Sequence, residues 1–185
     1  MTRWLISASL MLIAAGNVVD PHYYPSDISS WASDHLKAMH EPSLFHPEQD
    51  TSREEYRFLW LRTFNKAIAI RIWANADAPQ MRVVRLSGAG GYDPGHIESD
   101  KMIKISSDEW KRFRDSIARA QFWRMPTKDP NEELGLDGSQ WILEDRLNGK
   151  YHVVDHWTPS TGAYYDCCRL LIALSKEQIP HKEFY

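Results

Sequence analysis

The spacing of apolar and polar residues predicts four strands in the middle of the chain. Over residues 56–61 and 68–73, a bulky apolar side chain stands at every second position, as expected for strands that present two distinct faces. Short apolar runs at 81–86 and 101–105 predict two more strands. The segments between the first three strands are short and carry turn residues, at Asn65-Lys66 and at 76–79, which favours an antiparallel meander.

Apolar residues spaced three or four apart predict three helices. The first begins at Ser29 or Ser30, which can cap it, and ends before Pro42. The second begins with a capping box, in which Ser106 and Glu109 each accept a hydrogen bond from the other's backbone N–H. The third must end before Pro180. The positions that repeat at helical spacing are Ile28, Trp31, His35 and Met39, then Trp110, Phe113 and Ile117, then Cys167, Leu170, Leu171 and Leu174.

Residues 139–147 and 150–157 are predicted to form a β-hairpin. They are joined by Asn148-Gly149, a preferred pair for a two-residue type I′ turn because both positions need a positive φ. The short turn fixes the register, so that Asp145 lies opposite His152. One face then carries Trp141, Leu143, Asp145, Leu147, Lys150, His152, Val154 and His156. The other carries Gln140, Ile142, Glu144, Arg146, Tyr151, Val153, Asp155 and Trp157.

The order of elements is therefore helix, three strands, a short strand, helix, hairpin and helix. This order predicts an α+β fold: an antiparallel sheet, made of a three-strand meander and a C-terminal hairpin, with helices packed on one face. Residues 55–185 are expected to form a single α+β domain. Residues 17–54 are expected to form an N-terminal lead and the short helix, and 17–27 to lack regular structure.

The first sixteen residues predict a secretory signal peptide. A short positive start at Arg3 precedes an uncharged, mostly apolar run over residues 4–15, and small residues follow at Ala14-Ala15-Gly16. About 20 apolar residues are needed to span a bilayer, so this run is too short. We expect cleavage after Gly16, a periplasmic or secreted location, and no membrane insertion of the mature chain.

Charge and cysteine content narrow the function further. Of 22 basic and 25 acidic residues, only Arg3 lies in residues 1–16, so the predicted mature chain has a formal charge of −4. This balance offers no basic surface for phosphates, and nucleic acid is not expected as a partner. The two cysteines are adjacent, Cys167-Cys168, and cannot join distant segments. We expect both to be small buried hydrophobes, with a reactive or intermolecular thiol as the alternative.

The hairpin sequence carries a resemblance. It contains a W-x-L-E strand from Trp141 to Glu144, a glycine turn at Gly149, and then Y-H-x-V-x-x-W-x-P from Tyr151 to Pro159. This block resembles a pattern in a group of uncharacterised exported bacterial proteins. The resemblance covers about the last third of the chain and implies export and a related fold, but it implies no activity.

Candidate chemistry is concentrated on the hairpin. Asp145 opposite His152 is close enough for a charge-assisted contact, which would hold the imidazole and raise its pKa. His152 and His156 are about 13 Å apart at ~3.3 Å per residue, too far to bind one metal ion. Glu144 and Asp145 point to opposite faces and cannot act as a glycosidase pair.

The remaining motifs do not match a catalytic or cofactor-binding template. The glycine-rich segment 87–95 lacks the lysine of a phosphate loop, so we expect a connection, with a ligand-contacting loop as the alternative. The other histidines show no metal-ligand spacing, and no serine has the glycine frame of a nucleophile elbow. We therefore expect no cofactor, no metal site and no catalytic residue.

These observations favour a non-catalytic exported protein that binds another protein or an envelope component. The candidate contact residues are Glu144, Tyr151 and Trp157 on one hairpin face, which combine aromatic area with a charge, and His152 on the other face. The alternative for Tyr151 and Trp157 is packing under a helix. A second hypothesis is an envelope hydrolase that uses Asp145 and His152 with the glycine-rich segment as a lid. A third is a glycan-binding module, which would need two or more tryptophans aligned in an exposed groove.

Overall fold

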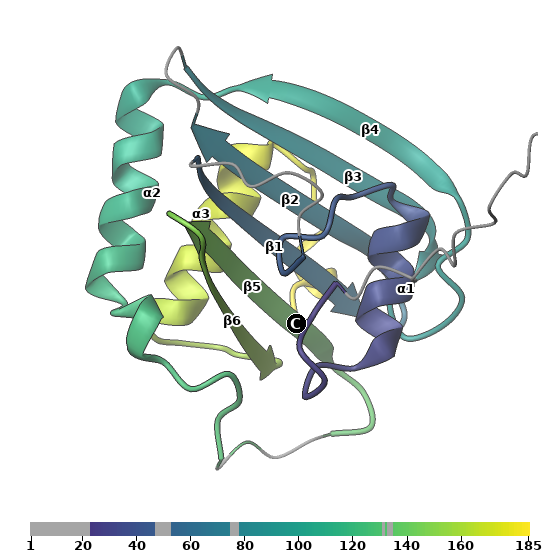
Figure 1. Ribbon diagram of the computed structural model, residues 1–185. Helices are drawn as coiled ribbons and strands as arrows, with labels where there is room; N and C mark the ends of the chain where they lie inside the picture. Colours follow the sequence, from purple (N-terminus) through teal and green to yellow (C-terminus); the bar gives the residue numbers. More distant parts are fainter. Residues whose placement is uncertain (1–22, 47–52, 75–77, 131, 133–134) are drawn as a thin grey trace, which may run out of the picture.

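The computed structural model describes residues 23–46, 53–74, 78–130, 132 and 135–185, and its centre is one antiparallel sheet (Figure 1). The strands are β1 (Glu54–Arg62), β2 (Lys66–Ala74), β3 (Pro79–Ala89), β4 (Ile97–Lys104), β5 (Ser139–Leu147) and β6 (Lys150–Trp157). Their order across the sheet is β4-β3-β2-β1-β5-β6. The strands β1, β2 and β3 pair in succession, and the C-terminal hairpin extends the same sheet beside β1. The predicted α+β class is confirmed.

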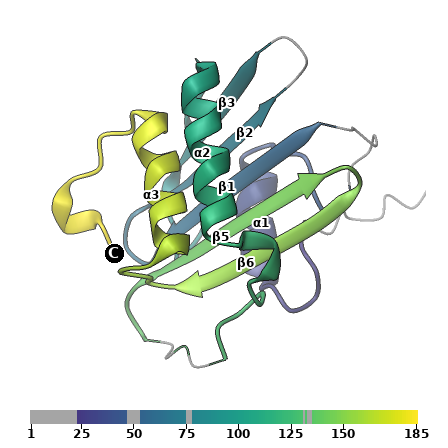
Figure 2. The same ribbon diagram turned by 90° about the vertical axis from the view of Figure 1, so that its left-hand side faces the viewer.

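Helices cover both faces of this sheet, so the prediction that they pack on one face is wrong. The helices are α1 (Ser30–Ala38), α2 (Ser107–Arg119) and α3 (Ala163–Ser175), with short 3-10 turns η1 (Phe122–Arg124) and η2 (His181–Glu183). In Figure 2, α2 and α3 lie in front of the sheet and α1 lies behind it. The physical reason is that the central strands are apolar on both faces and therefore need cover on both.

Each face of the sheet has its own apolar core. Phe58, Trp60 and Ile70 pack with α2 and α3, and all three are buried. Their neighbours Leu59 and Ala69 point the other way and pack with α1. Burial of a large apolar side chain contributes about 1.5–3 kcal/mol, so both layers are needed to hold the sheet.

The N-terminal segment belongs to the same folded unit. Tyr23 and Tyr24 are buried with α1 in the second core, and Leu44, which follows α1, is also buried. The part of residues 17–27 that the structure describes therefore packs on the sheet. The predicted signal peptide, residues 1–16, lies outside the described residues.

The local signals set the turns and caps as predicted. Asn148 and Gly149 have φ values of 50° and 75°, and Asp145 pairs with His152 in the predicted register. In the capping box, the Glu109 N–H donates to Ser106 Oγ (3.2 Å) and the Ser106 N–H donates to Glu109 Oε2 (2.8 Å).

Both cysteines are buried on α3 and are not joined in a disulfide. Burial raises the pKa of the Cys167 thiol and that of Cys168. The prediction that they act as small buried hydrophobes is confirmed. None of the helices in the described part of the chain has the length and apolar character needed to span a bilayer.

Candidate functional site

The hairpin brings Asp145 and His152 side by side under η1, but they do not form the predicted contact. Both carboxyl oxygens of Asp145 are buried without a hydrogen-bond partner among the described residues, and so is Nε2 of His152. The His152 ring instead stacks on Trp123, with ring centroids 5.7 Å apart, and packs edge-on against Phe122 at 5.1 Å. Burial lowers the pKa of His152, so the predicted rise is wrong.

Asp145 is the most unusual ionisable group on this face. Its side chain is fully buried, and desolvation raises the pKa of Asp145 to about 8, with a further rise from the charge of Glu54. Weak side-chain hydrogen bonding from Trp123 and Tyr56 lowers the pKa of Asp145, but it does not offset desolvation. Asp145 is therefore mainly protonated at neutral pH.

The hydrolase hypothesis gains no support from this arrangement. Neither Asp145 nor His152 lines any of four well-formed pockets in the described part of the chain. The glycine-rich segment cannot be their lid, because Asp145 pairs with Tyr56 near the start of β1 whereas Gly90 contacts Leu61 near its end. At ~3.3 Å per residue these positions are about 17 Å apart along the strand.

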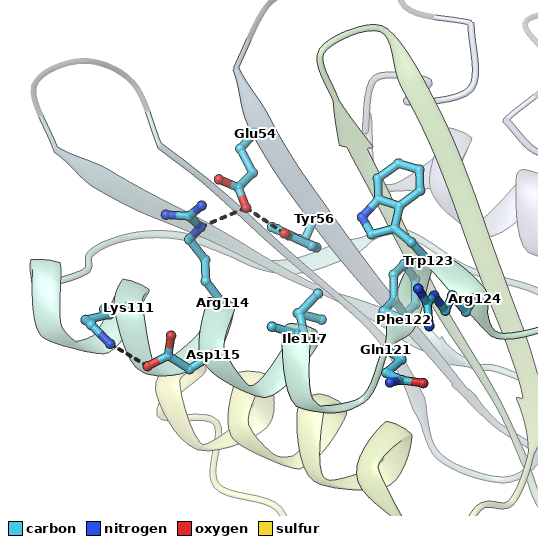
Figure 3. Close-up of a pocket in the computed structure, with 11 residues that line it drawn as sticks. Glu54, Tyr56, Lys111, Arg114, Asp115, Ile117, Gln121, Phe122, Trp123 and Arg124 are labelled. Atoms are coloured by element: carbon cyan, nitrogen blue, oxygen red, sulfur yellow. Dashed lines mark hydrogen bonds and ion pairs between the residues drawn. The ribbon is translucent and has the colours of Figure 1, made fainter.

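A pocket of about 620 Å³, the α2–η1 pocket, opens between α2, η1 and the start of β1 (Figure 3). Its aromatic residues are Tyr56, Phe122 and Trp123. In Figure 3, Glu54 lies between Arg114 and Tyr56, and the Trp123 indole lies on the other side of the pocket. Glu54 Oε1 accepts from the Tyr56 hydroxyl (2.6 Å) and from Arg114 Nε (3.0 Å).

The opposite face of the hairpin places Glu144 and Tyr151 in a buried ionic network. Glu144 is fully buried, and its carboxylate accepts hydrogen bonds from Arg57 Nε (2.7 Å) and from the Tyr151 hydroxyl (3.0 Å). Burial raises the pKa of Glu144, while the charge and hydrogen bond of Arg57 lower it. Glu144 therefore cannot belong to an exposed contact surface, and half-buried Tyr151 is held by it.

The network continues through Glu41, which joins three strands to the segment after α1. The Glu41 carboxylate pairs with Arg57 (3.4 Å), Arg71 (2.7 Å) and Arg82 (2.5 Å). Arg71 also pairs with Glu55 at 2.7 Å. These ionic contacts satisfy charges that would otherwise be buried alone, so we assign them a structural role.

Trp157 lies at the far end of the same hairpin face and lines a second pocket, the α1–β6 pocket, of about 270 Å³. Trp31 of α1 lines the same pocket, together with Leu61, Thr63, Gly90, Gly91 and Gln140. The indole Nε1 of Trp31 donates to the Gly90 carbonyl oxygen (2.7 Å), which fixes the ring. None of these lining side chains is ionisable.

The glycine-rich segment forms one wall of this pocket because only glycine fits there. A Cβ on Gly90 would lie 2.5 Å from the Leu61 Cα, and one on Gly91 would lie 2.9 Å from the Thr63 Cα. The Gly91 N–H donates to the Thr63 carbonyl oxygen (3.3 Å). The segment is thus packed on the end of β1 rather than being only a connection.

Exposed apolar side chains gather around this pocket. Six large hydrophobic residues are exposed in the described part of the chain: Trp31, Phe64, Tyr92, Met102, Trp123 and Leu136. Four of them, Trp31, Phe64, Tyr92 and Leu136, lie near the α1–β6 pocket. Phe64 follows Thr63 and contacts Tyr92, with ring centroids 6.3 Å apart. Leu136 lies between Gly135 and Gly138, which both approach Trp157. We call Trp31, Phe64, Tyr92, Leu136 and Trp157 the loop-end patch.

Sequence reasoning found one of these five residues, Trp157. Trp31 was predicted only as part of the apolar repeat of the first helix, and it is exposed. Phe64, Tyr92 and Leu136 come from two turns and from the segment before β5, where no periodic pattern marks them. Among the described residues, no three His, Cys, Asp or Glu side chains converge as a metal site would require. His156 packs against the Tyr164 ring, with centroids 4.5 Å apart.

No family model matches the chain, and none of the curated proteins is significantly similar to it.

Proposed function

We propose that this chain is an exported, non-catalytic binding protein that holds a protein partner at the loop-end patch. The observation that carries the proposal is the gathering of four of the six exposed large hydrophobic residues, among those the structure describes, around the pocket of Trp31 and Trp157. Single exposed apolar residues are ordinary, whereas a contiguous group is typical of an interaction surface. Tryptophan and tyrosine are also the residues that contribute most to protein interfaces.

The lining and rim indicate what kind of partner fits. The α1–β6 pocket has uncharged walls, so it suits an apolar side chain of the partner. Asp93 and Asp137 are exposed near the patch, and Lys182 lines a pocket beside Asp137. Acidic groups outnumber basic ones among these three, which favours a partner with basic residues around an apolar contact.

The test compares two residues of equal exposure. Phe64 and Met102 are each 59% exposed, but Phe64 lies in the patch and Met102 on the edge strand β4. The full chain is used to capture proteins from envelope extract, and the affinity of the purified partner is then measured by calorimetry. We expect Phe64→Ala and Trp31→Ala to weaken binding about 5- to 30-fold, and Met102→Ala to bind as wild type.

Equal affinities of Phe64→Ala and Met102→Ala would refute the patch as the docking site. Loss of capture after periodate oxidation of the extract would instead assign a glycan to the two tryptophans. Export is tested separately by N-terminal sequencing of the protein from the periplasm. The expected start is Asn17, and an intact Met1 on protein recovered from the cytosol would refute export.

A further inference from the structure

The Asp145 carboxyl has no close hydrogen-bond partner, and the side chains that act on it line the α2–η1 pocket. A buried polar group normally has a hydrogen-bond partner, and leaving a carboxyl without one is costly. Glu54 acts on the Asp145 carboxyl through its charge, and Trp123 and Tyr56 act on it through weak side-chain hydrogen bonding. All three line the pocket (Figure 3). Trp123 is the most exposed of the three, so its movement is the simplest route for a ligand from the pocket to Asp145.

Trp123 is suited to being displaced. It lies on η1, a turn of three residues, and is itself 38% exposed. Its indole stacks on His152 and hydrogen-bonds weakly to Asp145, and its neighbour Phe122 remains buried in the core. A rotation of the indole away from His152 would open the pocket to Asp145 without removing Phe122 from the core.

The charges around the pocket leave Asp145 as the group without a counter-ion. Arg114 of α2 is paired with Glu54 of β1 (3.0 Å), and Lys111 is paired with Asp115 on α2 (2.6 Å). Two further groups face this region: His152 of β6, whose Nε2 has no close hydrogen-bond partner, and Arg124 of η1, which is exposed. The charge of Arg124 opposes a bound cation, but it is screened by water. A cation beside Asp145 would also have aromatic faces near it, which stabilise organic cations.

We propose that the α2–η1 pocket binds an organic ammonium ion, which displaces Trp123 and pairs with the carboxylate of Asp145. The ligand would lie among Tyr56, Phe122 and the displaced Trp123, with Glu54 as a second, more distant carboxylate. This site is on the opposite face of the sheet from α1 and is independent of the loop-end patch.

The proposal has a proton signature. Free Asp145 holds its proton up to a pKa of about 8, and it must release that proton to pair with an ammonium group. Below this pH, the affinity for an amine that stays protonated should rise about tenfold for each unit by which the pH increases. Each bound ligand should release one proton from Asp145. An uncharged ligand of the same shape should show neither effect.

The experiment compares benzylamine with benzyl alcohol, which has the same ring and no charge. Titration calorimetry at pH 6, 7 and 8 measures affinity, and buffers of different ionisation enthalpy report proton release. We expect benzylamine to bind about tenfold more tightly at pH 7 than at pH 6. The variant Asp145→Asn should lose this dependence and bind at least about tenfold more weakly at pH 8. Asp34→Asn, which changes an exposed carboxylate of α1 on the opposite face of the sheet, should retain both.

Equal binding of benzylamine and benzyl alcohol would overturn the proposal, as would an unchanged pH dependence in Asp145→Asn. A folded variant is required for this comparison, and its stability is measured on the same samples by denaturant unfolding. Neither result bears on the loop-end patch, because none of its residues lines the α2–η1 pocket.

Discussion

Replacing Asp145 with asparagine should stabilise the protein, by an amount that increases with pH. Asparagine has nearly the shape of the protonated carboxyl that the fold holds, so the folded state changes little. The unfolded state differs, because an exposed aspartate ionises above its ordinary pKa of 3.8 while the folded state keeps the proton up to about pH 8. The wild type therefore loses stability as pH rises between these two values, and the asparagine variant does not.

The size of the effect follows from proton linkage. Each pH unit in this window changes the free energy of unfolding by about 1.36 kcal/mol for one proton. Between pH 3.8 and pH 7 the difference between variant and wild type should grow to about 4 kcal/mol. It should level off above about pH 8, where the folded state also loses the proton.

Urea unfolding of both proteins at pH 4, 5, 6, 7 and 8 measures this difference, provided that the dependence of free energy on denaturant is unchanged. Other titrating groups cancel because both proteins share them. Asp115→Asn is the matched control: its side chain is half-exposed, and a hydrogen bond from Lys111 lowers the pKa of Asp115. The free energy of unfolding of Asp115→Asn, relative to that of wild type, should therefore not increase with pH. A constant difference between wild type and Asp145→Asn across this range would refute the burial argument.

Three further outcomes are expected. Arg57→Met or Glu144→Leu alone should lower the free energy of unfolding by about 3–5 kcal/mol, because each leaves a buried charge, and the double variant should recover much of that loss in a double-mutant cycle. Additive losses would contradict this. Cys167 and Cys168 should react with Ellman's reagent only after unfolding, since both are buried and their pKa values are raised, so rapid labelling of the native protein would disprove it. Gly90→Ala should destabilise by about 1–3 kcal/mol through its clash with Leu61. Gly149→Ala meets no atom and should cost only about 1 kcal/mol for its positive φ, so equal denaturation midpoints would argue against the clash.

Local signals determined the elements that sequence could predict. Asn148-Gly149 restricts both backbone angles at one turn and thereby sets every cross-strand pair of the hairpin, including Asp145 with His152. Ser106 and Glu109 likewise define the start of α2 through contacts three residues apart. Local signals of this kind do not determine which side of the sheet a helix covers. That side depends on which face lacks cover, and the consecutive apolar residues Leu59, Trp60 and Leu61 were a local sign that both faces needed it.

The candidate sites were harder to predict because their residues come from distant segments. Trp157 could be proposed from the hairpin, but its pocket needs Trp31 from α1, which lies 126 positions earlier. The burial of Glu144 could not be foreseen, because its partner Arg57 lies on β1, 87 positions away. Alternation placed Glu144 and Asp145 on opposite faces, but it carried no information about which of them would find a counter-ion.

That difference between two adjacent carboxylates is the strongest physical reason to look for a ligand beside Asp145. Glu144 is buried with an arginine and a tyrosine hydroxyl, so the fold compensates the loss of water. Asp145 is buried as deeply and has only weak hydrogen bonding from Trp123 and Tyr56, although an asparagine or a leucine at the same position would avoid about 4 kcal/mol of loss at neutral pH. A buried ionisable group whose loss of water the fold does not compensate is expected at functional sites, where it can interact with a ligand. Because the neighbours of Asp145 also line the α2–η1 pocket, the missing partner is best sought there, in a ligand that brings its own positive charge.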